Sequence, residues 1–139
     1  HAAGLQSVHD YIGLCAPSLL QQALANYLEK YNYAEDFKAE FRQNITQSFQ
    51  SLSNVLNEQG FQIPKIDGGC FIWAELPEEF TDGFRFASIL YEENKVAVIP
   101  GEHFSTSKTN WIRFNIARPM DEIMAAEKEL TLFMQKHKG

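Results

Sequence analysis

The chain has 139 residues, of which 45% are hydrophobic and 22% charged, and its formal net charge is -6 with an isoelectric point near 5.2. This composition is ordinary for one globular domain with a sizeable core. The net negative charge is offset by no basic cluster, so it disfavours nucleic acid and anionic membranes as partners, because both are negatively charged.

Targeting and metal-binding signals are also missing from the sequence. No apolar run approaches the roughly 20 residues that span a bilayer, and the first residues lack the succession of a secretory signal, so we expect a cytoplasmic protein. Cys15 and Cys70 lie in unrelated contexts and form no metal-ligand spacing with the four histidines. We therefore expect reduced cysteines and no metal site.

The first third of the chain reads as helical. Apolar residues at helical spacing predict a short amphipathic helix over residues 2–12, which begins without a cap, so we expect the chain to start within a larger structure. Pro17 suits a first helical turn, and the stripe of the helix that follows is Leu20, Ala23, Leu24, Tyr27 and Leu28. That stripe needs a partner surface.

A longer helix follows the polar and aromatic break at residues 31–34. Its apolar residues repeat every three or four positions and end at Gly60; they are Phe37, Phe41, Ile45, Phe49, Leu52, Val55 and Leu56. We interpret this stripe as a core-facing surface rather than a ligand site. Residues 61–63 could form a short strand, residues 67–69 a turn, and Cys70, Ile72, Ala74 and Leu76 share one face of the next strand.

The remaining elements complete an α+β pattern. Thr81 or Asp82 is a suitable cap for a helix that reaches about Asn94, and a final amphipathic helix follows Pro119. Between these helices we expect strands over residues 96–99 and 111–117, joined by a polar loop over residues 105–110. The predicted fold is a small, mainly antiparallel sheet with helices packed on one face.

Arg113 is the strongest candidate for a binding residue. Ile112, Phe114 and Ile116 alternate with Trp111, Arg113 and Asn115, so Arg113 points away from the core on a largely polar face. A guanidinium on a rigid strand has the fork geometry that matches a carboxylate or phosphate. For an isolated strand, a solvated surface arginine is the more common interpretation.

No catalytic constellation stands out. Each lysine occupies an exposed helix position, a helix end, a turn or a terminus: Lys30, Lys38, Lys65, Lys95, Lys108, Lys128, Lys136 and Lys138. His103 and Ser105 have no third partner, and Glu78-Glu79 is a solvated approach to a helix. Gly68-Gly69 precedes a strand rather than a helix, which indicates a turn rather than a phosphate cradle.

Several stretches resemble the class I/II aminotransferases, pyridoxal-phosphate enzymes of fold type I. They are the Val-Ala-Val-Ile-Pro-Gly-x-x-Phe run at residues 96–104, the Ile-Arg-Phe strand at residues 112–114 and the Gly-Gly-Cys-Phe-Ile-Trp-Ala-Glu-Leu run at residues 68–76. The likeness covers the whole chain in the order expected. The opening resembles the methionine and kynurenine type within that family, on Val8-His9, Pro17 and residues 22–25.

The resemblance implies a C-terminal part of such an enzyme, with residues 1–33 ending the large domain and residues 34–139 forming the small domain. It implies an intact homodimer that uses pyridoxal 5'-phosphate to move an amino group from an amino acid to a 2-oxo acid. The Schiff-base lysine and the other cofactor-binding groups lie upstream in the family, so we expect no catalytic or cofactor-binding residue here and an inactive fragment without bound cofactor.

The resemblance also assigns roles to three residues. Arg113 matches the arginine that grips the substrate's α-carboxylate. Leu14 and Cys15 match an aromatic residue and a histidine that line the neighbouring subunit's pocket in kynurenine aminotransferases, and this departure leaves the selectivity open.

Two other functions are compatible with the residues alone. The first is a free-standing α+β module that binds an anionic small molecule, such as an amino acid, through Arg113. The second is a protein-interaction domain that uses the apolar faces of the first two helices. Continuation of the gene upstream, with a lysine shortly before His1, would favour the aminotransferase.

Overall fold

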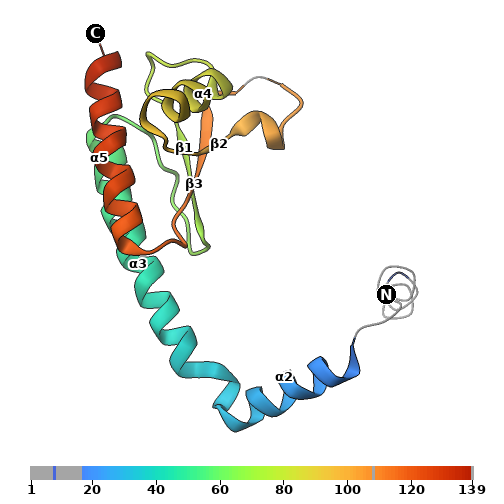
Figure 1. The fold of residues 1–139 in the computed structure, drawn as a ribbon. Helices are drawn as coiled ribbons and strands as arrows, with labels where there is room; N and C mark the ends of the chain where they lie inside the picture. Colours follow the sequence, from blue (N-terminus) through green and yellow to red (C-terminus); the bar gives the residue numbers. More distant parts are fainter. Residues whose placement is uncertain (1–7, 9–16, 108, 139) are drawn as a thin grey trace. The chain divides into compact units, whose positions relative to one another are not determined.

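The computed structural model describes residues 8, 17–107 and 109–138 (Figure 1). Apart from Val8, the helix expected over residues 2–12 lies outside the described residues. The elements in chain order are α2 (Ser18–Lys30), η1 (Asn32–Ala34), α3 (Glu35–Glu58), β1 (Phe71–Glu75), α4 (Gly83–Asn94), β2 (Ile99–Pro100), η2 (Gly101–Phe104), β3 (Trp111–Asn115) and α5 (Met120–His137). The chain divides into two compact units, one up to Glu40 and one from Phe41 onward.

The predicted second helix is confirmed as α2. Pro17 occupies its N-cap position, and no residue of α2 is buried. The apolar stripe is present, but Leu20 and Leu24 are exposed. The break after α2 is sharp because the residues of η1 have positive φ angles, which a continuing helix does not allow.

The predicted long helix is confirmed as α3, but its apolar stripe faces the core only in part. Phe37 and Phe41 are exposed, whereas Leu52 and Leu56 are buried. The expectation of a core-facing surface along the whole stripe is therefore wrong for its first two members. In the second unit, α3 and α5 lie side by side and run in the same direction (Figure 1), with Ser48 near Met120 and Lys138 near Gln59.

The three strands form one antiparallel sheet in the order β1-β3-β2. The predicted strand over residues 96–99 is wrong for Val96 to Val98, because pairing with β3 begins only at Ile99. Val96 and Val98 instead pack their side chains against the core. The expected strand over residues 61–63 is reduced to one bridge, in which Gln62 and Glu75 exchange backbone hydrogen bonds of 3.0 and 2.8 Å.

One hydrophobic core lies between the sheet and the helices of the second unit. Its strand residues are Ile72, Ala74, Ile112 and Phe114, and its helix residues come from the second half of α3 and from α4 and α5. Asp82 caps α4, as one of the two predicted candidates, by accepting a 2.9 Å hydrogen bond from the backbone N–H of Arg85. The predicted α+β fold with helices on one face of the sheet is confirmed.

Candidate functional site

Arg113 occupies the centre of the sheet. It lies opposite Trp73 of β1 and opposite Ile99 of β2, with β3 between them. Its neighbours Ile112 and Phe114 are buried in the core. The predicted orientation of Arg113, away from the core, is therefore confirmed.

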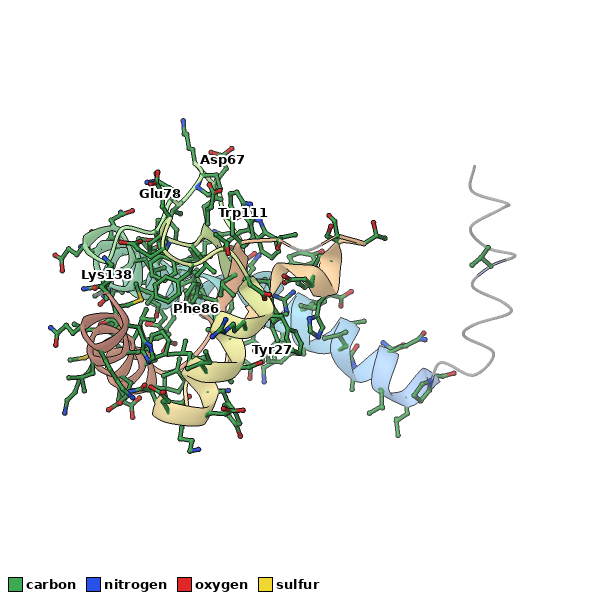
Figure 2. The ribbon with its side chains drawn as sticks, turned by 90° about the horizontal axis from the view of Figure 1, so that it is seen from above. Tyr27, Asp67, Glu78, Phe86, Trp111 and Lys138 are labelled. Carbon is green, nitrogen blue, oxygen red and sulfur yellow. The ribbon has the colours of Figure 1, made fainter. Side chains whose placement is uncertain are left out.

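The sheet has a second face, here called the outer face, that is aromatic as well as polar. It carries Phe71, Trp73, Glu75, Ile99, Trp111, Arg113 and Asn115. Trp73 and Trp111 stack with ring centroids 6.0 Å apart, and Phe104 of η2 meets Trp73 edge to face at 5.5 Å. Phe86 and Trp111, labelled in Figure 2, belong to the core and to the outer face respectively.

The alternation of β3 alone could not predict this character. The alternation of β3 places only Trp111 on the same face as Arg113, whereas the other rings belong to β1 and η2. The signal that could have found them is the alternation of β1 itself: Phe71 and Trp73 are out of phase with Ile72 and Ala74, so they must lie on the face that the core does not use. The expectation of a largely polar outer face is accordingly wrong.

The guanidinium of Arg113 lies close to two aromatic rings. Its Cζ atom is 4.3 Å from the ring centroid of Phe71 and 4.7 Å from that of Phe104. Its Nε atom is buried without a hydrogen-bond partner. No ion pair joins it to another described residue, so among these residues its positive charge is not neutralised by a carboxylate.

Two carboxylates near the sheet are engaged elsewhere. Glu75 accepts a 2.9 Å hydrogen bond from the Nδ2 group of Asn110. Glu102 accepts a 3.1 Å hydrogen bond from the backbone N–H of Thr109, which ties η2 to the loop before β3. The arrangement thus leaves a rigid cation available for an anionic ligand.

The described lysines do not provide a cofactor-binding pocket. Lys95 lines a pocket of about 620 Å³, but its Nζ atom donates to the backbone carbonyl of Glu92. Lys38 pairs with Glu35, Lys136 pairs with Glu93, and Lys138 donates to a backbone carbonyl. The others described, Lys30, Lys65 and Lys128, are exposed. None of these residues fits the buried amine that pyridoxal phosphate requires.

The other candidates from the sequence also have simple structural roles. Gly68 and Gly69 have φ angles of +155° and +113° in the turn before β1, as expected for glycines in a turn. Ser105 Oγ lies 3.1 Å from Ser107 Oγ, an interaction within its own loop. Leu14 and Cys15 lie outside the described residues, so their assignment to a substrate pocket stays a prediction.

Known proteins resemble this chain over nearly its whole length. The sequence model of the family "Aminotransferase class I and II" matches residues 5–127. A probable aspartate aminotransferase of Methanocaldococcus jannaschii is 31% identical over 120 residues, which are 86% of this chain and 30% of that protein.

Solved structures share the fold. An aromatic aminotransferase from Pyrococcus horikoshii superposes with a TM-score of 0.84 at 20% identity, over 95% of this chain and 35% of that one. YbdL from Escherichia coli, for which a methionine aminotransferase function has been identified, superposes with a TM-score of 0.71 at 26% identity, over 92% and 34%.

The chain spans about a third of the length of the curated relatives it matches, at 34% and 30% for two of them. None of the described helices is long and apolar enough to cross a membrane. The family match covers far more than half of the chain, and both the aminotransferase motifs and the fold agree with it. The chain therefore belongs to the class I and II aminotransferases.

Proposed function

We propose that this chain is the C-terminal part of an aminotransferase in which Arg113 binds the α-carboxylate of the substrates. Class I and II aminotransferases depend on pyridoxal 5'-phosphate, which supplies the electron sink for amino transfer when bound. The proposed substrates are an amino acid as donor and a 2-oxo acid as acceptor. The observation that carries the proposal is the guanidinium of Arg113, which is held on the outer face with no partner carboxylate among the described residues.

One arginine can serve both half-reactions because both substrates keep the same carboxylate. The amino group leaves the donor and joins the acceptor, while the carboxylate beside the reacting carbon is unchanged. A guanidinium offers two parallel N–H donors to the two oxygens of that group and so fixes the substrate's orientation. Because β3 pairs on both sides, the backbone that carries Arg113 is fixed at that position.

The rest of the active site is proposed to come from polypeptide that this chain does not contain. Residues 1–33 are assigned to the end of the large domain and residues 34–139 to the small domain of a cytoplasmic homodimer. The absence of a suitable amine among the described lysines supports a Schiff-base lysine elsewhere. The chain by itself is accordingly proposed to be inactive, with no stoichiometric, borohydride-stable lysine adduct of the cofactor.

The carboxylate role can be tested on the chain alone with pyruvate as the probe. Trp73 and Trp111 are the two tryptophans of the chain, and both lie on the outer face, so their fluorescence reports on ligands there. We expect weak, saturable binding, with a dissociation constant on the order of 1 mM or above, because the face is partly solvated.

Two variants decide where pyruvate binds. Arg113→Lys should weaken binding at least severalfold, since a point charge does not reproduce the planar fork. Arg85→Lys is the matched control, because Arg85 is exposed on α4, and it should leave binding unchanged. Both variants keep the positive charge, so equal effects would mean that the response is not specific to the guanidinium of Arg113 and would remove the support for that residue. Because both the aminotransferase part and the free-standing module would bind pyruvate without catalysis, the upstream continuation of the gene distinguishes them.

A further inference from the structure

We infer that Phe71 and Phe104 are positioning residues that hold the Arg113 guanidinium in one plane and leave its terminal edge for the carboxylate. This inference rests on the proposed function of Arg113. It assigns a role to two residues that need not form polar contacts with the substrate themselves. The two rings come from different elements, β1 and η2, and flank the same Cζ atom at 4.3 and 4.7 Å. An arginine in contact with two rings has fewer accessible rotamers than one that contacts a single ring.

Guanidinium chemistry determines what such a pair of rings can do. The two faces of the planar group form poor hydrogen bonds and stack well on aromatic rings, whereas the edges carry all the donors. Stacking therefore does not consume the donors that a carboxylate needs. It also fixes the direction of the fork before the substrate arrives, which reduces the conformational entropy lost on binding.

The burial of Nε limits the directions from which a ligand can reach the Arg113 guanidinium. This atom is buried and has no hydrogen-bond partner, so the edge that contains it is closed to a ligand. The two terminal nitrogens are not among the buried polar atoms, so they form the open edge. A carboxylate is therefore expected to bind end-on, with one oxygen on each terminal nitrogen.

The position of Phe104 is itself fixed by a close contact at the start of η2. A Cβ atom added to Gly101 would lie 2.2 Å from Oγ1 of Thr109 and 3.1 Å from Cβ of Trp111. Glycine thus lets η2 sit directly against the residues that lead into β3. Glu102 reinforces the contact through the backbone N–H of Thr109, and Phe104 then meets Trp73 and Arg113 three residues after Gly101.

The exposure of the two rings agrees with a role beyond packing. Phe71 is 44% exposed and Phe104 is 56% exposed, so neither is a core residue. Replacing either with leucine keeps an apolar side chain and removes the ring, and the fold should survive because neither position is buried.

The experiment measures the side-chain mobility of arginine by ¹⁵N relaxation at Nε in the whole chain. The chain has four arginines, Arg42, Arg85, Arg113 and Arg118. Arg42 and Arg85 are exposed and serve as internal references, whereas Arg118 is ion-paired with Glu122. In the unaltered chain, the Arg113 Nε–H signal should be the most ordered of the four and shifted upfield by the two rings. Pyruvate affinity, measured from tryptophan fluorescence, is the second readout.

The variants distinguish the effect of an aromatic ring from the effect of an apolar side chain in general. Phe104→Leu and Phe71→Leu should each raise the mobility of the Arg113 Nε–H and weaken pyruvate binding by roughly 3- to 10-fold. Phe104→Tyr keeps a ring and should stay within about twofold of the unaltered chain. Phe84→Leu is the matched control, because Phe84 is a similarly exposed phenylalanine on α4, and it should change neither readout.

The outcomes distinguish this inference from the function on which it rests. If the unaltered chain binds pyruvate through Arg113 but both leucine variants leave its mobility and affinity unchanged, the positioning role is wrong while the proposed function stands. Increased mobility without weaker binding would also contradict the positioning role. If pyruvate does not bind the unaltered chain, the two rings do not prepare Arg113 for a carboxylate and the positioning role is wrong, whereas the proposed function is overturned by near-normal kinetics of Arg113→Lys in the intact enzyme.

Discussion

The two faces of the three-stranded sheet have opposite character although they share the same strands. The inner face contributes Ile72, Ala74, Ile112 and Phe114 to a closed core beneath the helices. The outer face contributes tryptophans, Phe71 and Arg113, several of which remain partly exposed. Strict alternation along β1 and β3 places the core residues on one face of each strand and Arg113 with its aromatic neighbours on the other.

This difference predicts that stability and the proposed ligand binding are separable in this domain. Substitutions on the inner face remove buried apolar contacts and should act on the free energy of unfolding. Substitutions on the outer face change the surroundings of Arg113 and should act mainly on ligand affinity and activity.

The largest expected effect comes from a comparison in which one isoleucine on each face of the sheet is replaced by alanine. Ile112 is 0% exposed in the core, so Ile112→Ala should lower the free energy of unfolding by roughly 2–5 kcal/mol. Ile99 lies on the outer face at 37% exposure, so Ile99→Ala should lower it by less than about 1 kcal/mol. Urea unfolding measures both, and similar losses at the two positions would contradict the division between the faces.

Activity should show the reverse pattern at Arg113. In the intact enzyme, Arg113→Lys should lower kcat/KM for amino and oxo acids by about 30-fold or more, which corresponds to roughly 2 kcal/mol of lost transition-state stabilisation. The free energy of unfolding should fall by about 1 kcal/mol or less, because only the stacking on Phe71 and Phe104 is lost. Half-reaction kinetics and thermal unfolding on the same variant test this. Near-normal kinetics with a large loss of stability would make Arg113 a structural residue.

Local sequence patterns predicted the helices and the inner face well. Period-3.6 stripes located α2, α3, α4 and α5, and the alternation of β3 predicted that Ile112 and Phe114 are buried. These features depend on neighbours a few residues away, so a single sequence carries them. The family and the orientation of Arg113 followed from the same local motifs.

The missed features are those that depend on distant partners. Val96 to Val98 have β-branched character, yet whether they form a strand depends on where the ladder with β3 begins. The stripe of α3 does not reveal that its first phenylalanines lie outside the core. The aromatic pair around Arg113 joins residues more than 30 positions apart, from β1 and η2, and no periodicity within β3 encodes it.

A smaller loss of stability is expected where η2 approaches the sheet. Gly101→Ala places a methyl group 2.2 Å from Oγ1 of Thr109, so the free energy of unfolding should fall by roughly 1–3 kcal/mol. In the Thr109→Ala background, the same substitution should cost less, because the nearest clashing atom is gone. A double-mutant cycle by urea unfolding measures this coupling. If the losses of free energy from the two substitutions were fully additive, η2 would move away from Thr109 as a unit, and the close contact would not fix the position of Phe104.

The smallest expected effect lies on the solvent side of the helices that cover the inner face. Oε2 of Glu93 on α4 is 2.9 Å from Nε2 of His137 and 2.8 Å from Nζ of Lys136, both on α5. The hydrogen bond with His137, followed by that with Lys136, lowers the pKa of Glu93 from its ordinary value of 4.5. A carboxylate with a lowered pKa stabilises the folded state above pH 4.5, and this contribution is lost as the pH falls through the folded-state pKa.

Because this contact is exposed, it should add only slightly to the packing in the core that already joins α4 to α5. Glu93→Gln should flatten the fall in melting temperature between neutral pH and pH 3 without unfolding the protein. Glu92→Gln, at the neighbouring exposed position, is the matched control and should retain the unaltered pH profile. Melting curves at a series of pH values measure the difference. If Glu93→Gln instead abolished folding at neutral pH, the attachment of α4 to α5 would depend on this ion pair, and the inner face would not be the dominant source of stability.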